Sequence, residues 1–196
     1  MKKVMFSLVV LAVVILASLG NVAQAAYESI TSDYKIQKAL MVLDAHGEGA
    51  TVRTLVRKNI QIKFTDLAMM SPAYMRYNAL AAKDSRNNQY IFIDNKHKSA
   101  PVEALAALLA HEATHQNVVY GASIDEETQA HCNEAKFWIK VTASNPALKN
   151  NPHPLVVREN TLAERFGNQG REAIQTMVAS NSSYANLPQR VPSSAR

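Results

Sequence analysis

The segment His111-Glu112-Ala113-Thr114-His115 is an HExxH motif, and its residue types and spacing could perform chemistry. On a helix, residues i and i+4 lie above one another on one face, so His111 and His115 can bind one metal ion. Glu112 lies one residue further round, where its carboxylate can reach a water molecule at the metal. Two histidine ligands and a glutamate base suit zinc-dependent hydrolysis of an amide.

Chance is a poor explanation for this motif. With 6 His in the whole chain, roughly 0.01 matches are expected in a sequence of this composition. The preceding residues 102–110 are nearly all apolar, which predicts a buried helix, and histidine and glutamate that enter a buried segment need partners. The alternative is an ordinary helix that carries these residues on a solvated face. We favour the metal site.

Residues 1–25 have the features of a bacterial secretory signal peptide. Two lysines near the start precede an apolar run, Met5–Leu19, and Ala23-Gln24-Ala25 matches an A-x-A cleavage site, so Ala26 is the predicted mature N-terminus. The alternative is an uncleaved anchor, but the run is shorter than the about 20 residues of a membrane span. We therefore expect a periplasmic or secreted protein with no stable membrane span after cleavage.

Composition limits the remaining possibilities. Loss of the two N-terminal lysines lowers the formal charge from +5 to +3, and the basic residues are scattered, so nucleic-acid binding is not expected. Cys132 is the only cysteine, which excludes an intramolecular disulfide and predicts a small core residue. Residues 26–180 are expected to form one domain, with residues 181–196 as a flexible tail.

The apolar spacing predicts a mostly helical α+β fold. The strongest strand is Tyr90–Asp94, and Asn59–Phe64 also alternates apolar and polar residues. Residues 66–82 are ambiguous. Helices are predicted over 33–44, 50–58, about 100–120, 123–144 and 155–179.

A third ligand is needed because catalytic zinc usually has three protein ligands. From His115 the predicted helix rises about 7.5 Å to Tyr120, and after a turn the next helix descends about 6 Å from Ser123 to Glu127. Glu127 thus returns to the level of His115, and we favour it as the ligand. The other candidates are Asp125, Glu126, His131 and Glu134.

Neighbouring residues have other expected roles. Ser123 and Glu126 match a capping box, in which the Glu126 side chain closes back on the start of the helix. His131 lies one turn beyond Glu127 and is expected to orient a ligand, to stabilise an oxyanion, or to be an ordinary core histidine. The other candidates for stabilising an oxyanion are His153, Tyr120 and Arg158.

The HExxH motif followed by Glu127-Thr128-Gln129-Ala130 resembles the gluzincin zinc metallopeptidases, in particular small bacterial minimal gluzincins. The resemblance covers roughly residues 50–145. It implies a zincin-like fold, in which a small sheet with an edge strand, here Tyr90–Asp94, packs on the motif helix. A glutamate-bearing helix and C-terminal helices would follow. The interval from His115 to Glu127 is short for many gluzincins, and His131 stands where an aspartate is frequent.

The resemblance also implies a mechanism. His111, His115 and Glu127 would hold Zn²⁺, Glu112 would act as general base, and the edge strand would align a peptide or protein substrate. One alternative is a non-catalytic periplasmic metal-binding or interaction protein with the same fold. Another is a helical domain with an accidental motif. Two histidines and a carboxylate also suit Mn²⁺ or Fe²⁺, and the sequence does not specify an oligomeric state.

Overall fold

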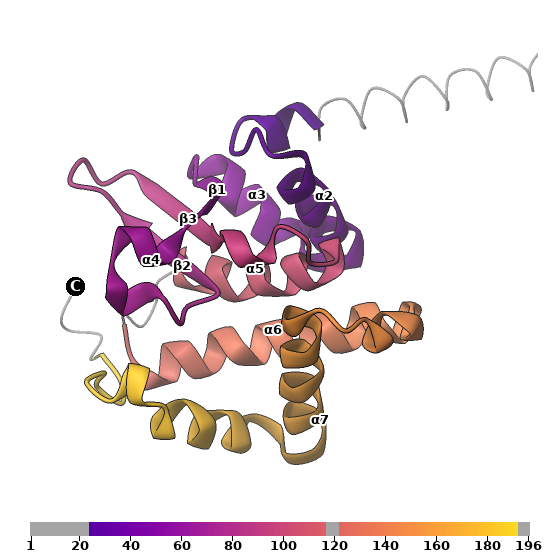
Figure 1. Cartoon of the computed structure of the whole chain (residues 1–196), viewed down its shortest axis with the longest axis vertical. Helices are drawn as coiled ribbons and strands as arrows, with labels where there is room; N and C mark the ends of the chain where they lie inside the picture. The colour runs from indigo at the N-terminus through magenta and orange to yellow at the C-terminus, as the bar shows by residue number, and fades with distance from the viewer. Residues whose placement is uncertain (1–23, 117–121, 192–196) are drawn as a thin grey trace, which may run out of the picture.

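The computed structural model describes residues 24–116 and 122–191, which form a mostly helical α+β fold with one small sheet (Figure 1). This confirms the prediction of a mostly helical α+β fold. Of the predicted signal peptide, all but residues 24 and 25 lie outside the described part, as do Tyr120 and Gly121. Within the described ranges, no helix combines the length and apolar character that a bilayer span requires.

The N-terminal layer consists of α2 (Tyr34–Leu43) and α3 (Gly49–Arg57), both close to their predicted bounds. Asp33 caps α2 by accepting hydrogen bonds from two backbone N–H groups of the first turn. A single wide turn, η1 (Asp44–Glu48), separates the helices, and Gly47 in it has a φ of 90°. Glycine adopts this left-handed conformation without a steric penalty, so it allows the change of direction here.

Three strands form a mixed sheet in the order β1-β3-β2. β3 (Gln89–Asp94) pairs in parallel with β1 (Gln61–Thr65) and antiparallel with β2 (Ala79–Lys83). The prediction that Tyr90–Asp94 is an edge strand is therefore wrong, because both sides of β3 are hydrogen-bonded to neighbours. Among the described residues no strand pairs with the outer side of β2, which is the edge beside the motif helix.

The central helix is α5 (Val102–Gln116), which carries the HExxH motif. It packs against α2 and β2 and, on another side, against α6 (Ile124–Ser144). Every residue from Ala104 to Ala113 is buried, as expected for a helix that is apolar on all faces. Small alanine side chains let the neighbouring helices approach α5 closely, and the motif is consequently held inside the core.

The C-terminal layer is made by α6 and α7 (Pro154–Ser180). The indole N–H of Trp138 on α6 donates a 2.9 Å hydrogen bond to the Asn160 side chain on α7, which joins the two helices. Gly170 has a φ of 70° and divides α7 into two arms that run in different directions (Figure 1). The first arm and the second arm therefore meet α6 at different points.

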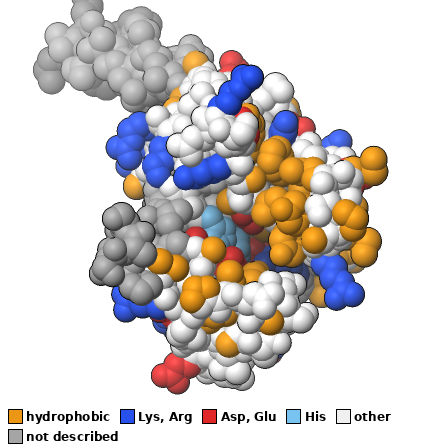
Figure 2. All heavy atoms as spheres, turned by 90° about the vertical axis from the view of Figure 1, so that its left-hand side faces the viewer, with side chains coloured by type: hydrophobic (Ala, Val, Ile, Leu, Met, Phe, Trp, Pro, Cys, Tyr) orange, Lys and Arg blue, Asp and Glu red, His pale blue; other side chains and the backbone are white. Residues whose placement is uncertain are grey.

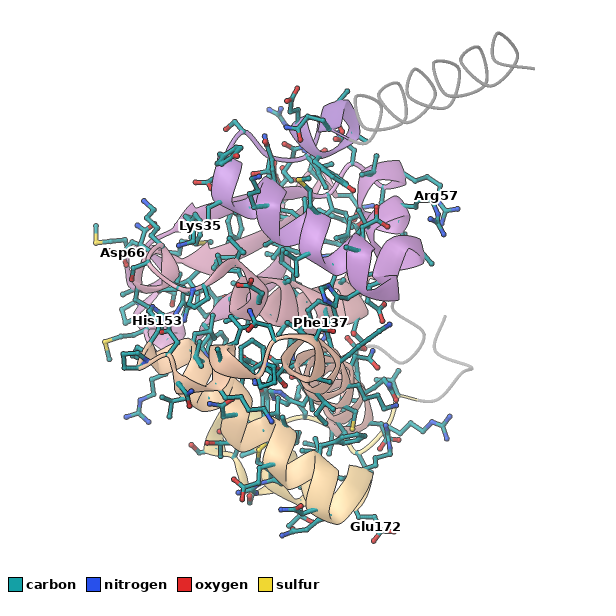
Figure 3. The ribbon with its side chains drawn as sticks, turned by 90° about the vertical axis from the view of Figure 1, so that its right-hand side faces the viewer. Lys35, Arg57, Asp66, Phe137, His153 and Glu172 are labelled. Atoms are coloured by element: carbon teal, nitrogen blue, oxygen red, sulfur yellow. The ribbon has the colours of Figure 1, made fainter. Side chains whose placement is uncertain are left out.

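Side chains of α6 join the layers on both of its sides. Phe137 points into the interior, where its ring lies 6.0 Å from that of His46 in η1 (Figure 3). Cys132 is buried in a cluster with Leu162 and Ile174 of α7, which confirms the prediction of a small core residue. The short helical turns are α4 (Leu67–Met70), η2 (Pro72–Tyr74), η3 (Asn95–His97), η4 (Pro146–Asn150) and η5 (Ser182–Tyr184).

Residues 181–191, which we name the strap, are the described part of the predicted C-terminal tail of residues 181–196, and they contact α6. The backbone N–H groups of Ile124 and Asp125 donate to the carbonyls of Pro188 and Gln189 at 2.9 and 3.1 Å. The first N–H groups of a helix have no partner within it, so α6 gains two acceptors here. The strap is consequently fixed against the start of the helix that carries Glu127.

Candidate metal centre

His111 and His115 of α5 and Glu127 of α6 meet at one point, as predicted. The two histidine Nε2 atoms are 3.3 Å apart, and the two Glu127 carboxylate oxygens lie 3.8 Å from His111 Nε2 and 3.7 Å from His115 Nε2. Ligands at about 2.0–2.1 Å from a tetrahedral ion would be about 3.3 Å apart. The three groups could therefore hold a metal ion after small movements.

Both histidines are held by a carboxylate at their other ring nitrogen. His111 Nδ1 lies 3.1 Å from Glu134 and His115 Nδ1 lies 2.7 Å from Glu126. A carboxylate only accepts, so each Nδ1 carries the proton and each Nε2 presents a lone pair in the neutral ring. When both rings are neutral, two lone pairs and the Glu127 carboxylate face one another, an arrangement that a cation would stabilise.

The Glu126 contact differs from the predicted capping box. Ser123 does cap α6 by accepting a 3.2 Å hydrogen bond from the backbone N–H of Glu126. The Glu126 side chain, however, binds the imidazole of His115 instead of returning to the backbone of Ser123. The return of α6 beside α5 brings the imidazole of His115 within reach of this carboxylate.

The two histidines differ in their affinity for protons. Burial, with the neighbouring charge of His131, lowers the pKa of His111 to about 3, so its ring is neutral and ready to bind a metal. Burial also opposes the charge on His115, but the hydrogen bond with Glu126 and the nearby Glu112 and Glu127 raise its pKa to about 9. A metal ion at this point would therefore compete with a proton on His115.

Behind His111 lies a buried charged network. The Glu134 carboxylate accepts hydrogen bonds from His111, from His131 at 3.0 Å and from the Arg158 guanidinium of α7. Burial opposes its ionisation, yet the Arg158 charge and the bond with His111 hold the pKa of Glu134 well below its usual range. Arg158 also binds Glu159, whose pKa burial raises well above normal.

A second group, His111, His131 and Glu134, also has ligand atoms close together. Its Glu134 oxygens already accept from both imidazoles and from Arg158, whose fixed positive charge repels a cation. This group is better suited to orienting His111 than to holding an ion. His131 accordingly lies behind His111, with ring centroids 4.4 Å apart.

Glu112 is 5% exposed and lies beside the three ligand groups in the same cleft. Its pKa is raised to about 7, chiefly because burial disfavours the charged form, and Glu127 and Glu134 add to this. A carboxylate with a pKa near neutrality can both accept and return a proton at physiological pH. Glu112 thus combines the position and the proton affinity that a general base requires.

These residues line a cleft of about 780 Å³. The strand β2 contributes to its wall along its whole length, from Ala79 to Lys83. Side chains of α7 and the strap also line it, among them Leu162, Met177, Val178, Tyr184 and Leu187. In Figure 2 histidine side chains are visible inside a hollow of the surface. The side chains of His115 and Glu127 are each 16% exposed, so these two groups are accessible from outside.

The other predicted site residues are mostly elsewhere. His153 caps α7 by accepting from the backbone N–H of Leu155, outside the cleft lining, and Asp125 binds Gln189 of the strap at 3.1 Å. Arg158 lines the cleft but is bound to Glu134 and Glu159. Tyr120 lies outside the described residues.

Tyr184 is a site residue that the sequence analysis missed. It lines the cleft, and its ring lies 6.5 Å from that of His131 at a steep angle. Burial and the Glu127 carboxylate raise the pKa of its phenol, which places a neutral O–H donor beside the ligand groups. The sequence around Tyr184 is rich in Ser and Asn and has no periodic pattern that would predict a structural element. The place of Tyr184 in the cleft follows only from the hydrogen bonds between the strap and α6.

Comparison of the chain with protein-family models, with curated proteins and with solved structures finds no match.

Proposed function

We propose that this protein is a zinc-dependent metallopeptidase that acts outside the cytoplasm. The observation that carries the proposal is the convergence of His111 Nε2, His115 Nε2 and the Glu127 carboxylate, with Glu112 buried beside them. Because each histidine is held by a carboxylate at Nδ1, the ligand atoms are oriented in advance. This arrangement, together with β2 beside the motif helix, supports a zincin-like fold of the gluzincin kind.

The residues of the chain have distinct roles in this proposal. Zn²⁺ held by His111, His115 and Glu127 would activate a water molecule and polarise the scissile carbonyl. Glu112 accepts the proton of the attacking water and delivers it to the leaving amine. The phenol of Tyr184, a neutral O–H donor, and the ring of His131 also line the cleft and would be candidates for stabilising the developing oxyanion.

The outer edge of β2, rather than β3, supports substrate alignment. Ala79–Lys83 lines the cleft, and its side chains are small apart from Leu80 and Lys83. An extended peptide can add to such an edge through backbone hydrogen bonds, which place successive amides past the metal group. The substrate would therefore be an extended stretch of polypeptide, which agrees with the peptide or protein substrate expected from the sequence.

Hydrolysis of a denatured protein such as casein tests the proposal. The purified protein with one equivalent of Zn²⁺ is expected to release peptides, and the Glu112→Gln variant is expected to keep the metal but lose at least about 100-fold in rate. Equal rates in both proteins would remove Glu112 from the base role. Bound metal without any hydrolysis would favour a non-catalytic metal-binding protein.

A further inference from the structure

A methionine-rich lip lies next to the cleft. We define the lip as residues 66–77, which contain α4 and η2. Met69, Met70 and Met75 are 84%, 43% and 62% exposed, which is unusual for large apolar side chains. Only Asp66 and Arg76 are charged in these twelve residues.

The exposure of the lip does not come from a loose backbone. At its start, Leu67 is fully buried and its N–H donates to the Asp94 side chain at the end of β3. At its end, the Lys96 ammonium donates to the Tyr77 carbonyl at 2.6 Å. Asp66 caps α4 and projects from the surface (Figure 3). The methionines are therefore presented to solvent by a segment that is fixed at both ends.

The lip is continuous with the cleft. Tyr74 and Tyr77 both line the cleft, and their rings lie 5.6 Å apart. The chain passes directly from Tyr77 through Asn78 into β2, the free strand edge. Figure 2 shows apolar side chains gathered beside the hollow in which histidine is visible. A polypeptide on β2 would thus meet the tyrosines inside the cleft and the methionines outside it.

We propose that the lip is a docking surface for apolar segments of an extended polypeptide, which the adjacent metal centre would cleave. This inference rests on the proposed function and names its substrate class. Methionine side chains are flexible and polarisable, so they adapt to different apolar sequences. A bilayer surface fits less well, because it could touch only the outer methionines and the lip offers a single cation, Arg76.

Binding to the Glu112→Gln protein tests the inference without requiring hydrolysis. The probes are two fluorescein-labelled peptides of about ten residues, one alternating Leu and Val with Ser, the other with Gln in place of Leu and Val. Fluorescence anisotropy is expected to show about tenfold tighter binding of the apolar peptide. Equal affinity for the two peptides would overturn the proposal.

Substitution of the lip locates the binding surface. Met69→Ser combined with Met75→Ser should weaken binding of the apolar peptide about tenfold, because both side chains lose apolar contact area. Met41→Ser is the matched control, since Met41 is also exposed (41%) but lies on α2 outside the cleft lining. Unchanged binding in the double variant, or an equal loss in the control, would overturn the proposal.

A lipid membrane and a second copy of the protein are the two other possible occupants of the lip, and the same double variant tests for them. Sedimentation with vesicles of phosphatidylethanolamine and phosphatidylglycerol, and light scattering after size exclusion, are measured with and without the double substitution. If the substitution abolishes vesicle binding or dissociates a dimer but leaves peptide affinity unchanged, the lip is a membrane or self-association surface and the proposal fails. If the apolar preference persists but the wild-type protein hydrolyses nothing, only the proposed reaction fails.

Discussion

Glu126 and Glu127 are adjacent in sequence, yet they serve opposite sides of one imidazole. Glu127 faces the Nε2 atom of His115, where a metal would lie, while Glu126 binds the Nδ1 atom at 2.7 Å. In the proposed centre, the first position would supply a ligand and the second would orient one. A single helical turn of α6 thus provides two functions that a sequence pattern alone does not separate.

The two glutamates should therefore differ in their effect on metal binding. Glu127→Ala removes a ligand and is expected to weaken Zn²⁺ affinity by more than about 100-fold, whereas Glu126→Ala should weaken it by about 10- to 100-fold. Competition with a chromophoric chelator measures both constants. The reverse ranking would assign the third ligand to Glu126.

Arg158 lines the cleft, but we expect its main contribution to be to the stability of the fold. Arg158→Gln leaves Glu134 buried without its cation, which is expected to lower the free energy of unfolding by about 3 kcal/mol. This loss of unfolding free energy is at the lower end of the range for removing one partner of a buried ion pair, because the Arg158 side chain is 28% exposed. Urea denaturation measures the loss. The exposed Arg165→Gln on the same helix should change stability little, and equal losses would contradict this account.

These residues also show what local sequence can predict. His111, Glu112 and His115 follow from helical periodicity, and Glu127 follows from the short return of the next helix. The sequence marked Glu134 and Arg158 as candidates for other roles, but their ion pair does not follow from it, because this contact depends on how α7 packs against α6. The place of Tyr184 in the site could not be predicted either, because it depends on the strap. The backbone contacts of the strap join residues more than sixty positions apart in the sequence.

At the scale of elements, the helices were predicted well and the sheet less so. Helix ends are marked by local capping residues, and the structure confirms the predicted N-cap of α6 at Ser123. The strand β2 has the sequence Ala-Leu-Ala-Ala-Lys, whose residues do not favour strands. Its pairing with β3 comes from the tight connection around Asp84, whose side chain accepts hydrogen bonds from two backbone N–H groups of the turn. Consequently the edge strand was assigned to the wrong segment.

Replacing either of two glycines by alanine tests the backbone conformation of the helical layers. Gly47 in η1 has a φ of 90°, so Gly47→Ala is expected to destabilise the protein by about 1 kcal/mol. Gly167 lies within α7, and a Cβ there meets no atom within 4 Å, so Gly167→Ala should stabilise by about 0.5–1 kcal/mol. Thermal unfolding measures both, and a shift of the same sign in the two variants would contradict the left-handed conformation of Gly47.

At the scale of the molecule, the candidate metal centre lies where the sheet, α5 and the C-terminal layer come together. β2 and the lip line one part of the cleft, α7 and the strap line another, and the paired helices α5 and α6 carry the ligands. No single element contains more than two of the three ligand groups. Stability of the whole fold is therefore expected to influence metal binding directly.

Acid should weaken the fold through a histidine that is remote from the metal centre. Burial, aided by the charge of Lys96, lowers the pKa of His97 from its ordinary value of 6.5 to about 4. The unfolded chain therefore binds this proton at a higher pH than the folded chain, and folded-state stability falls as the pH drops from about 6.5 to about 4. His97→Gln should show a smaller fall in melting temperature over this interval, and parallel curves for both proteins would exclude the effect.

The most direct test of the central claim is the metal content of the purified protein, measured by mass spectrometry of the elements beside that of His111→Ala. We predict about one zinc ion per chain in the wild-type protein and a large loss in the variant, because His111 supplies one of three ligand groups. No bound metal after reconstitution, or equal metal in both proteins, would contradict the proposed centre.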